Sequence, residues 1–315
     1  MSREAIPVDE FVLGDGSPQM PAVWGDGDRI AWASGEPLMI YGPEGVGKST
    51  IAQQLALSLA GIRSPTFLGM TVRPCAGRVL YLALDRPKQI RRSLARMADW
   101  EISPSGSERL YIRHGALGID LVEDPAGLWL LAEAEGATTV IVDSLKDILP
   151  DLSKDESGNA FQWAAGHVID AGIELLVLHH PTKSVTGKSL ADSYGSRWLT
   201  AATGSVLSIS GTPGASTVKL NHLKQPIEDI GTLNLWHDHR RGITTLRGSG
   251  DLSAILATYG PLVAKEAAGL QFGDTSPDAV ERARRALEKL VPLVAVRQPR
   301  DGGMVEYRLV DGEET

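Results

Sequence analysis

Hydrophobic and polar positions follow one repeating order between about residue 30 and residue 247. Short aliphatic and β-branched runs end in polar or turn residues, and amphipathic stretches follow them. This order predicts an α/β fold with a mostly parallel sheet and helices on both faces. The clearest predicted strands are residues 37–41, 78–84, 139–142 and 174–178. Because ligands bind beyond the carboxyl ends of such strands, we expect the four strand ends to form one site.

Two other patterns follow these strands. Residues 216–222 and 231–237 alternate in polarity, which predicts antiparallel strands that extend the sheet. Beyond residues 248–250, the pattern predicts three helices and then a hairpin around a Gly-rich turn. These predicted elements are helices 252–259, 263–270 and 277–290, strands 291–296 and 305–310, and the turn 300–303. Three short helices before a hairpin is the element order of a winged helix-turn-helix.

Composition narrows the class of protein. The 315 residues are 43% hydrophobic and 22% charged, which is ordinary for a globular protein. Neither a membrane-spanning run nor a signal-peptide pattern is evident, so we expect a cytoplasmic protein. Cys75 is the only cysteine, which excludes an intramolecular disulfide and a cysteine-cluster metal site. A net charge of −8 argues against coating nucleic acid with the whole surface, but it permits local contacts.

Residues 42–49 fit the phosphate-binding pattern G-x-x-x-x-G-K-[ST] between a predicted strand and a predicted helix. The glycines allow backbone N–H groups to surround phosphate oxygens, and the helix N-terminus adds a positive dipole. Lys48 is expected to reach the β- and γ-phosphates, and Ser49 to ligate Mg²⁺. The predicted ATP-binding residues are Gly42, Pro43, Glu44, Gly45, Val46, Gly47, Lys48, Ser49 and Thr50.

Polar residues end the other predicted strands. Asp143 follows a buried strand, as a Mg²⁺-holding carboxylate requires, although an aspartate there also suits a helix cap. Asp85 is a candidate for activating water, with an N-cap before Pro87 as the equal alternative. His179 and His180 are candidates for sensing the γ-phosphate; the alternative is a hydrogen-bonded turn.

Together these motifs resemble RecA-like ATPases, and most closely plasmid RepA-type hexameric replicative helicases. The resemblance covers about residues 22–247 and follows the family order. Its motifs are residues 42–50 (Walker A), 81–87 (the strand with the catalytic carboxylate), 140–145 (Walker B), 178–183 (the His-His sensor) and 194–196 (the Gly-Ser segment). We therefore expect an N-terminal arm over 1–21, an ATPase domain over 22–247 and a winged-helix-like domain over 248–315.

The resemblance implies a homo-oligomeric ring, a hexamer in that family, in which ATP lies between subunits. The stretches 146–161 and 182–195 then face a central channel that holds single-stranded DNA. Lys183, Lys188 and Arg197 are the candidate DNA contacts, although the two lysines also suit a solvated loop.

Two departures from the family affect hydrolysis. Asp85 replaces a glutamate, and residues 201–204 contain no arginine where the family carries its finger. Lys224 is the first candidate for a trans-acting finger and Arg197 the second; surface charge is the alternative for both. Both departures predict slow turnover.

The C-terminal residues 249–315 hold eight basic and eleven acidic residues, a net charge of −3, so contact with DNA and contact with replication proteins are equally expected. Two functions follow for the whole chain: a ring-forming helicase or translocase on single-stranded DNA, or a DNA-associated ATPase switch without processive unwinding. A small-molecule kinase shares the phosphate loop, but no acceptor-site pattern supports it.

Overall fold

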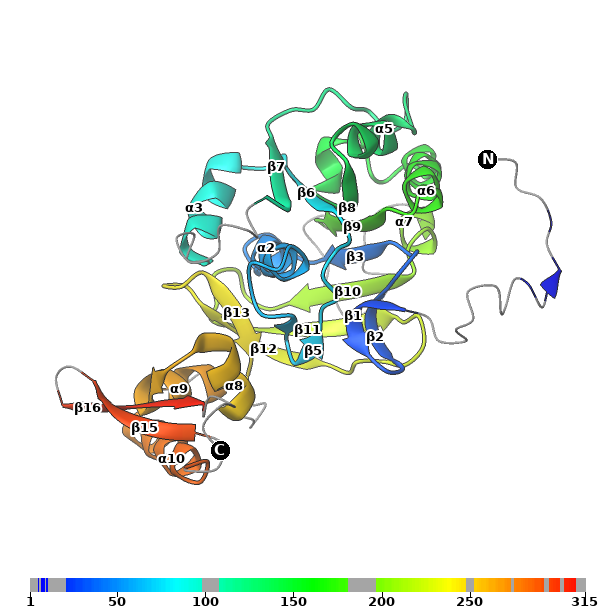
Figure 1. Ribbon diagram of the computed structural model, residues 1–315. Coiled ribbons are helices and arrows are strands. Elements are labelled where there is room, and N and C mark those ends of the chain that lie inside the picture. The colour runs from blue at the N-terminus through cyan, green and yellow to red at the C-terminus, as the bar shows by residue number, and fades with distance from the viewer. Residues whose placement is uncertain are drawn as a thin grey trace.

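The computed structural model centres on a nine-stranded sheet (Figure 1). It describes residues 5, 7, 8, 10, 21–97, 108–180, 197–247, 252–272, 275–291, 295–300 and 303–309, without the side chains of residues 197, 198, 253, 254, 257, 258 and 272. In spatial order the strands are β13 (Ile243–Leu246), β12 (Leu233–Asp238), β11 (Thr217–Lys224), β10 (Ser205–Ser210), β3 (Leu38–Tyr41), β9 (Glu174–His179), β8 (Ala137–Asp143), β6 (Arg78–Ala83) and β7 (Leu110–His114).

The sheet is parallel from β10 to β7 and antiparallel from β10 to β13. All four strands predicted from the clearest hydrophobic runs are present, and both alternating segments form strands of the antiparallel extension. The predicted α/β fold is therefore confirmed.

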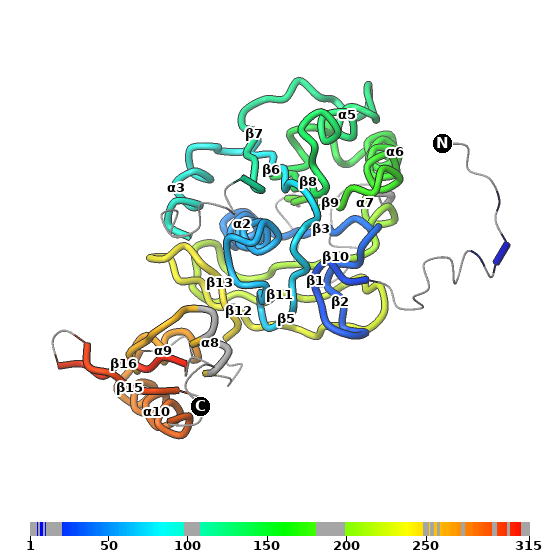
Figure 2. The backbone as a smooth tube through the Cα atoms, viewed as in Figure 1, coloured from blue at the N-terminus to red at the C-terminus, as the bar shows by residue number. Residues whose placement is uncertain are grey.

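Helices cover both faces of the sheet, because its central strands are apolar on both sides (Figure 2). Within β3, Leu38 and Ile40 enter one core while Met39 and Tyr41 enter the other, as the twofold alternation of a strand requires. The first core also holds α2 (Lys48–Leu59) and α3 (Pro87–Met97). The second holds α5 (Gly127–Ala134), α6 (Asp155–Asp170) and α7 (Arg197–Ala201).

Two small antiparallel ribbons complete the first core. They are β1 (Ala22–Asp26) with β2 (Arg29–Ala33), and β4 (Thr66–Phe67) with β5 (Met70–Thr71). The indole N–H of Trp24 donates to the carbonyl oxygen of Phe67 at 3.0 Å, and the ring is fully buried. This bond satisfies the polar edge of a large apolar side chain and joins the two ribbons.

The C-terminal unit, residues 252–309, has a core of its own. It contains α8 (Leu252–Tyr259), β14 (Leu262–Val263), α9 (Ala264–Phe272), α10 (Pro277–Glu288), β15 (Ala295–Arg300) and β16 (Met304–Leu309). The three predicted helices and the hairpin are present, but Val263 belongs to a strand that pairs with β16 and not to a helix. The strand predicted over 291–296 begins at Ala295. The winged-helix assignment stays a prediction from element order.

The C-terminal unit lies against the antiparallel end of the sheet (Figure 1). Trp236 of β12 packs against the core of this unit. No helix in the described part of the chain is both long enough and apolar enough to span a bilayer.

Candidate nucleotide-binding site

The phosphate loop joins β3 to α2, and its glycines are required by close packing. A Cβ atom on Gly42 would collide with the carbonyl oxygen of Ile209, and one on Gly47 would collide with the ring of His237. Gly47 also has a φ of 94°, in the left-handed region that favours glycine. The loop is therefore fixed against β10 and β12, with the N-terminus of α2 directed at the site.

Lys48 is the first residue of α2, and its side chain turns back over the loop. Its ammonium donates to the carbonyl oxygens of Gly42 at 2.6 Å and Pro43 at 2.7 Å. Burial lowers the pKa of Lys48 to about 8, while the nearby carboxylates of Asp143 and Glu44 oppose that shift. An ammonium held over the phosphate loop in this way is suited to receive the oxygens of a polyphosphate.

Asp143 ends β8 and is buried beside the phosphate loop. Its Oδ2 accepts a hydrogen bond from the Tyr81 hydroxyl at 2.7 Å, and it is also hydrogen-bonded to the Ser49 side chain. Burial raises the pKa of this carboxyl, and the two hydrogen bonds oppose the rise. Ser144, and not Asp143, caps the following short helix η1 (Leu145–Asp147), so the helix-cap alternative does not describe the Asp143 carboxylate.

The neighbouring oxygens of Ser49 and Asp143 fit a Mg²⁺ ion. Hydroxyl and carboxylate oxygens are the donors that this hard cation prefers. Asp143 is only 2% exposed, and among the described residues it forms no ion pair. A divalent cation would supply the counter-charge that this buried carboxylate needs.

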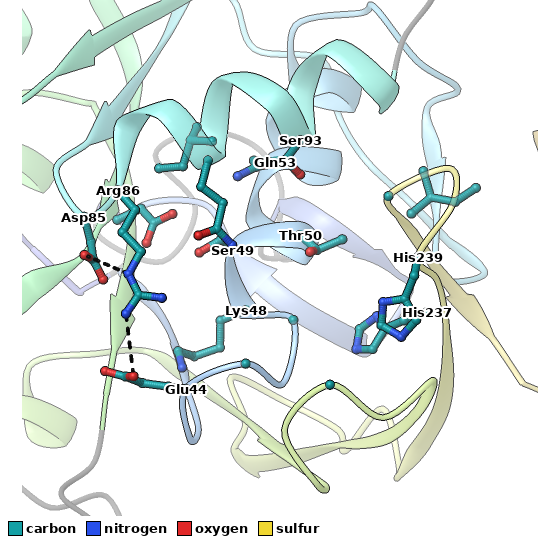
Figure 3. Close-up of a pocket in the computed structure, with 18 of the residues that line it drawn as sticks. Glu44, Lys48, Ser49, Thr50, Gln53, Asp85, Arg86, Ser93, His237 and His239 are labelled. Carbon is teal, nitrogen blue, oxygen red and sulfur yellow. Dashed lines mark ion pairs between the residues drawn. The ribbon is translucent and has the colours of Figure 1, made fainter.

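Asp85 follows β6 and is held next to Asp143. The backbone N–H groups of Leu84 and Asp85 donate to the Asp143 carbonyl oxygen at 2.9 and 3.1 Å. Its carboxylate forms an ion pair with Lys146 of η1 at 3.1 Å. Arg86 lies 3.9 Å from Asp85 and 3.9 Å from Glu44, and it bridges them (Figure 3). In the described structure, the Asp85 carboxylate bonds to Lys146 and not to the N-terminus of α3.

The two adjacent histidines occupy different environments. His179 ends β9 and is buried, whereas His180 lines the cavity beside the phosphate loop. Burial, with Lys48 and Lys146 nearby, lowers the pKa of His180 to about 3. Among the described residues its Nδ1 has no hydrogen-bond partner. A neutral imidazole with one unpaired nitrogen can respond to a phosphate oxygen or to water.

His237 of β12 braces the phosphate loop, a role that the sequence did not predict. Its Nε2 lies 3.0 Å from the Val46 carbonyl oxygen, and its Nδ1 lies 2.6 Å from the Thr244 hydroxyl. A carbonyl only accepts, so Nε2 carries the proton and Nδ1 accepts from Thr244. The backbone of Thr244 in turn bonds to the amide side chain of Gln54 on α2. The alternating polarity of residues 231–237 predicted the strand, but it gave no sign that His237 contacts the phosphate loop.

These groups surround a cavity of about 340 Å³, within the usual range for ligand sites (Figure 3). Asp85, Arg86 and Glu44 lie at one end, and His237 and His239 lie at the other (Figure 3). The lining comprises Glu44, Gly45, Gly47, Lys48, Ser49, Thr50, Gln53, Asp85, Arg86, Gln89, Ile90, Ser93, Arg96, Asp143, His180, Gly214, His237, Asp238, His239, Gly242 and Ile243. The structure thus brings together the strand ends that the sequence assigned to one site.

Lys224 does not line this cavity. The Lys224 ammonium donates to the carbonyl oxygens of Thr200 at 3.1 Å, Ala201 at 3.3 Å, and Thr203. It therefore binds the C-terminal end of α7 in its own chain, and its role as a finger stays a prediction. Lys183 and Lys188 lie outside the described residues, as does the side chain of Arg197, which begins α7.

A Ser–His–Asp cluster outside the cavity is structural. Ser205 Oγ lies 2.9 Å from His222 Nε2, and Asp229 lies 3.8 Å from Nδ1. The Ile230 N–H donates to Nδ1 at 3.4 Å, so the proton is on Nε2 and points at the serine. This is the wrong tautomer for a base that activates a nucleophile, and Ser205 is only 1% exposed.

Comparison with known proteins identifies the family of the chain. Residues 15–185, more than half of the chain, match the model of the AAA domain family. The chain belongs to this family. One solved structure, the ATPase domain of another protein, is similar, with a TM-score of 0.54 and 12% identity over 77% of this chain and 99% of that domain.

A second structural match is weaker. A KaiC-like protein from the hyperthermophilic archaeon Pyrococcus horikoshii gives a TM-score of 0.45 and 13% identity over 68% of this chain and 90% of that one. No curated protein matches the sequence. At 12% identity the first of these structures bears on the fold alone.

Proposed function

We propose that this member of the AAA domain family hydrolyses ATP with Mg²⁺. The observation that carries this proposal is the arrangement of Lys48, Ser49 and Asp143 around one cavity, with Asp85 at its end. Lys48 would bind the β- and γ-phosphates, and Ser49 with Asp143 would hold the metal ion. The ion would neutralise charge on the phosphate oxygens.

Asp85 is the carboxylate best placed to orient the attacking water. It is hydrogen-bonded through its backbone to the end of β8, which fixes it relative to Asp143. Its side chain is 27% exposed, so water can reach it. His180 lines the same cavity as Asp85 and is neutral, and we propose that it responds to the γ-phosphate.

The finer proposal is a ring-forming helicase or translocase on single-stranded DNA. Its support is the order in which the motifs of the resemblance follow one another in the sequence, together with the position of η1. This short helix opens the predicted channel segment 146–161, and its Lys146 contacts Asp85. A force on that segment would therefore act directly on the carboxylate that orients water. Replication proteins are proposed to bind through the C-terminal unit.

Unwinding of a forked duplex by the purified oligomer tests this proposal. Activity should require ATP and Mg²⁺, and it should be lost in Lys48→Ala. An oligomer of verified mass that hydrolyses ATP in the presence of single-stranded DNA, but never separates the fork, would exclude the helicase.

One observation favours a second candidate, a DNA-associated ATPase switch. The Lys146–Asp85 ion pair at 3.1 Å occupies the carboxylate that would otherwise orient water. Such a pair lowers the rate of hydrolysis unless another ligand moves η1. ATPase rate and oligomer mass, measured together with and without single-stranded DNA, distinguish the two candidates. ATP-dependent assembly with a slow rate that DNA leaves unchanged would support the switch.

The variant Lys146→Met tests the role of the ion pair directly, because it removes the cation and keeps a similar side-chain length. If the pair restrains Asp85, the basal ATPase rate rises several-fold and the response to DNA shrinks. Lys154→Met is a matched control, since Lys154 pairs with Asp151 at 3.5 Å on the same segment and away from Asp85.

A further inference from the structure

Arg63, in the turn after α2, is partly exposed as a whole, but one nitrogen of its guanidinium is buried. Its Nη1 atom is inaccessible to solvent and forms no hydrogen bond within the described part of the chain. No ion pair with an acidic side chain is present there either. Burial lowers the pKa of this guanidinium, and only Tyr259 acts in the other direction. A guanidinium in this position is costly unless an anion accompanies it.

Arg63 lines a small cavity between the ATPase core and the C-terminal unit. The walls come from α2 and the turn after it, from β4 and the turn that follows it, from β13 and from α8. In Figure 1, α8 lies beside the end of the sheet that β12 and β13 form. The cavity is separate from the nucleotide cavity, and it measures about 70 Å³.

A second unsatisfied group lines the same cavity. The hydroxyl of Thr245 on β13 is buried and has no hydrogen-bond partner among the described residues, and the residue is 7% exposed. Tyr259, at the end of α8, lines a third side. Buried hydroxyl groups are normally hydrogen-bonded, so one unpaired hydroxyl beside an unpaired guanidinium indicates a missing acceptor.

Size and donor arrangement identify the class of acceptor. A volume of about 70 Å³ exceeds the roughly 10–15 Å³ that a cavity needs to hold one water molecule, and it is far below what a nucleotide requires. The possible donors Arg63, Thr245 and Tyr259 come from three different elements, so they approach from three sides. We propose that this cavity binds a small tetrahedral oxyanion of the phosphate class, with Arg63 as its counter-ion.

The position of the site connects it to the phosphate loop. Ile243 of β13 lines the nucleotide cavity, while Thr244 and Thr245 line the anion cavity. Gln54 of the phosphate-loop helix also lines the anion cavity, and it bonds to the backbone of Thr244. A bound anion would therefore hold α8, β13 and α2 together at the junction of the two units.

Calorimetric titration of inorganic phosphate into the full-length protein tests the proposal. Excess ADP and Mg²⁺ are present throughout, because the phosphate loop itself would otherwise bind phosphate. Arg63→Met retains the apolar stem and removes the charge, so phosphate should bind at least about tenfold more weakly. Thr245→Val, which changes only the hydroxyl, should weaken binding a few-fold. Arg92→Met, at an exposed position on α3, should bind as the wild type does.

Three results would overturn the proposal. The first is phosphate affinity that is equal in Arg63→Met and wild type, or no phosphate binding in the wild type. The second is a response of the same size to chloride at matched ionic strength. The third is Arg63→Met unfolding at a lower denaturant concentration than wild type in phosphate-free buffer, because that would show a protein partner for Arg63. The comparison of phosphate affinity with and without Arg63→Met is repeated in the Lys48→Ala background. This separates a failure of the phosphate loop to bind nucleotide from a failure of the Arg63 cavity to bind phosphate.

Discussion

Replacing His237 with phenylalanine tests whether the antiparallel end of the sheet shapes the phosphate loop. The substitution keeps a flat ring over Gly47 but removes the hydrogen bonds to the Val46 carbonyl at 3.0 Å and to the Thr244 hydroxyl at 2.6 Å. Both partners are then left in a buried environment. A ring carbon cannot remain 3.0 Å from a carbonyl oxygen without repulsion, so the Val46 carbonyl must move away from the ring and the phosphate loop must shift with it.

The expected loss follows from the number of bonds removed. Each hydrogen bond contributes about 1 kcal/mol net, and an unsatisfied buried partner costs about 1–3 kcal/mol, so we expect the free energy of unfolding to fall by about 2–4 kcal/mol. Displacement of one loop N–H from a phosphate oxygen should weaken ADP binding at least about tenfold. Urea denaturation measures the first quantity, and titration with a fluorescent ADP analogue measures the second.

Two controls isolate the role of the imidazole. Thr244→Val removes only one of the two bonds and should cost about 1–2 kcal/mol of stability, with a small effect on ADP affinity. His239→Phe alters an exposed histidine whose ring centroid lies 6.2 Å from that of His237, and it should leave stability unchanged. If His237→Phe matches wild type within about 0.5 kcal/mol and binds ADP equally well, His237 does not brace the loop.

Four further outcomes can be measured. Lys48→Ala should lower the ATPase rate at least about 100-fold with a native circular dichroism spectrum; a rate near wild type would exclude its phosphate role. Asp143→Asn should raise the Mg²⁺ concentration for half-maximal ATPase about tenfold or more, and an unchanged Mg²⁺ titration would contradict the assignment. Tyr81→Phe, which removes a 2.7 Å bond to a buried carboxylate, should lower the free energy of unfolding by about 1.5–3 kcal/mol in urea. The free energy of unfolding should decline as pH falls below about 6.5. Burial lowers the pKa of His180 to about 3 and lowers that of His237, so these histidines bind protons in the unfolded chain at a higher pH than in the folded one. In urea titrations from pH 7 to pH 4, His180→Gln should show a shallower decline, and an identical slope would refute this reasoning.

The amino-acid sequence determined the central architecture and the phosphate end of the site. Apolar runs of strand length and the amphipathic stretches between them are local signals, and they were sufficient for β3, β6, β8 and β9. The rule that ligands meet the carboxyl ends of parallel strands then placed Asp85, Asp143 and His180 near the loop that contains Lys48. Those side chains do line one cavity. Local patterns also gave α8 with its observed bounds.

Only the tertiary structure decided which distant side chains meet. His237 is 191 residues from Val46, and their contact depends on the strand order that brings β12 against the loop. The ion pair between Lys146 and Asp85 depends on the geometry at the ends of two neighbouring strands. The sequence likewise shows an arginine at residue 63 but gives no sign that its Nη1 atom is buried without a hydrogen-bond partner among the described residues. Hydrophobic periodicity reports which face of an element is buried, whereas partner identity depends on how separate elements pack, and that information is spread over the whole chain.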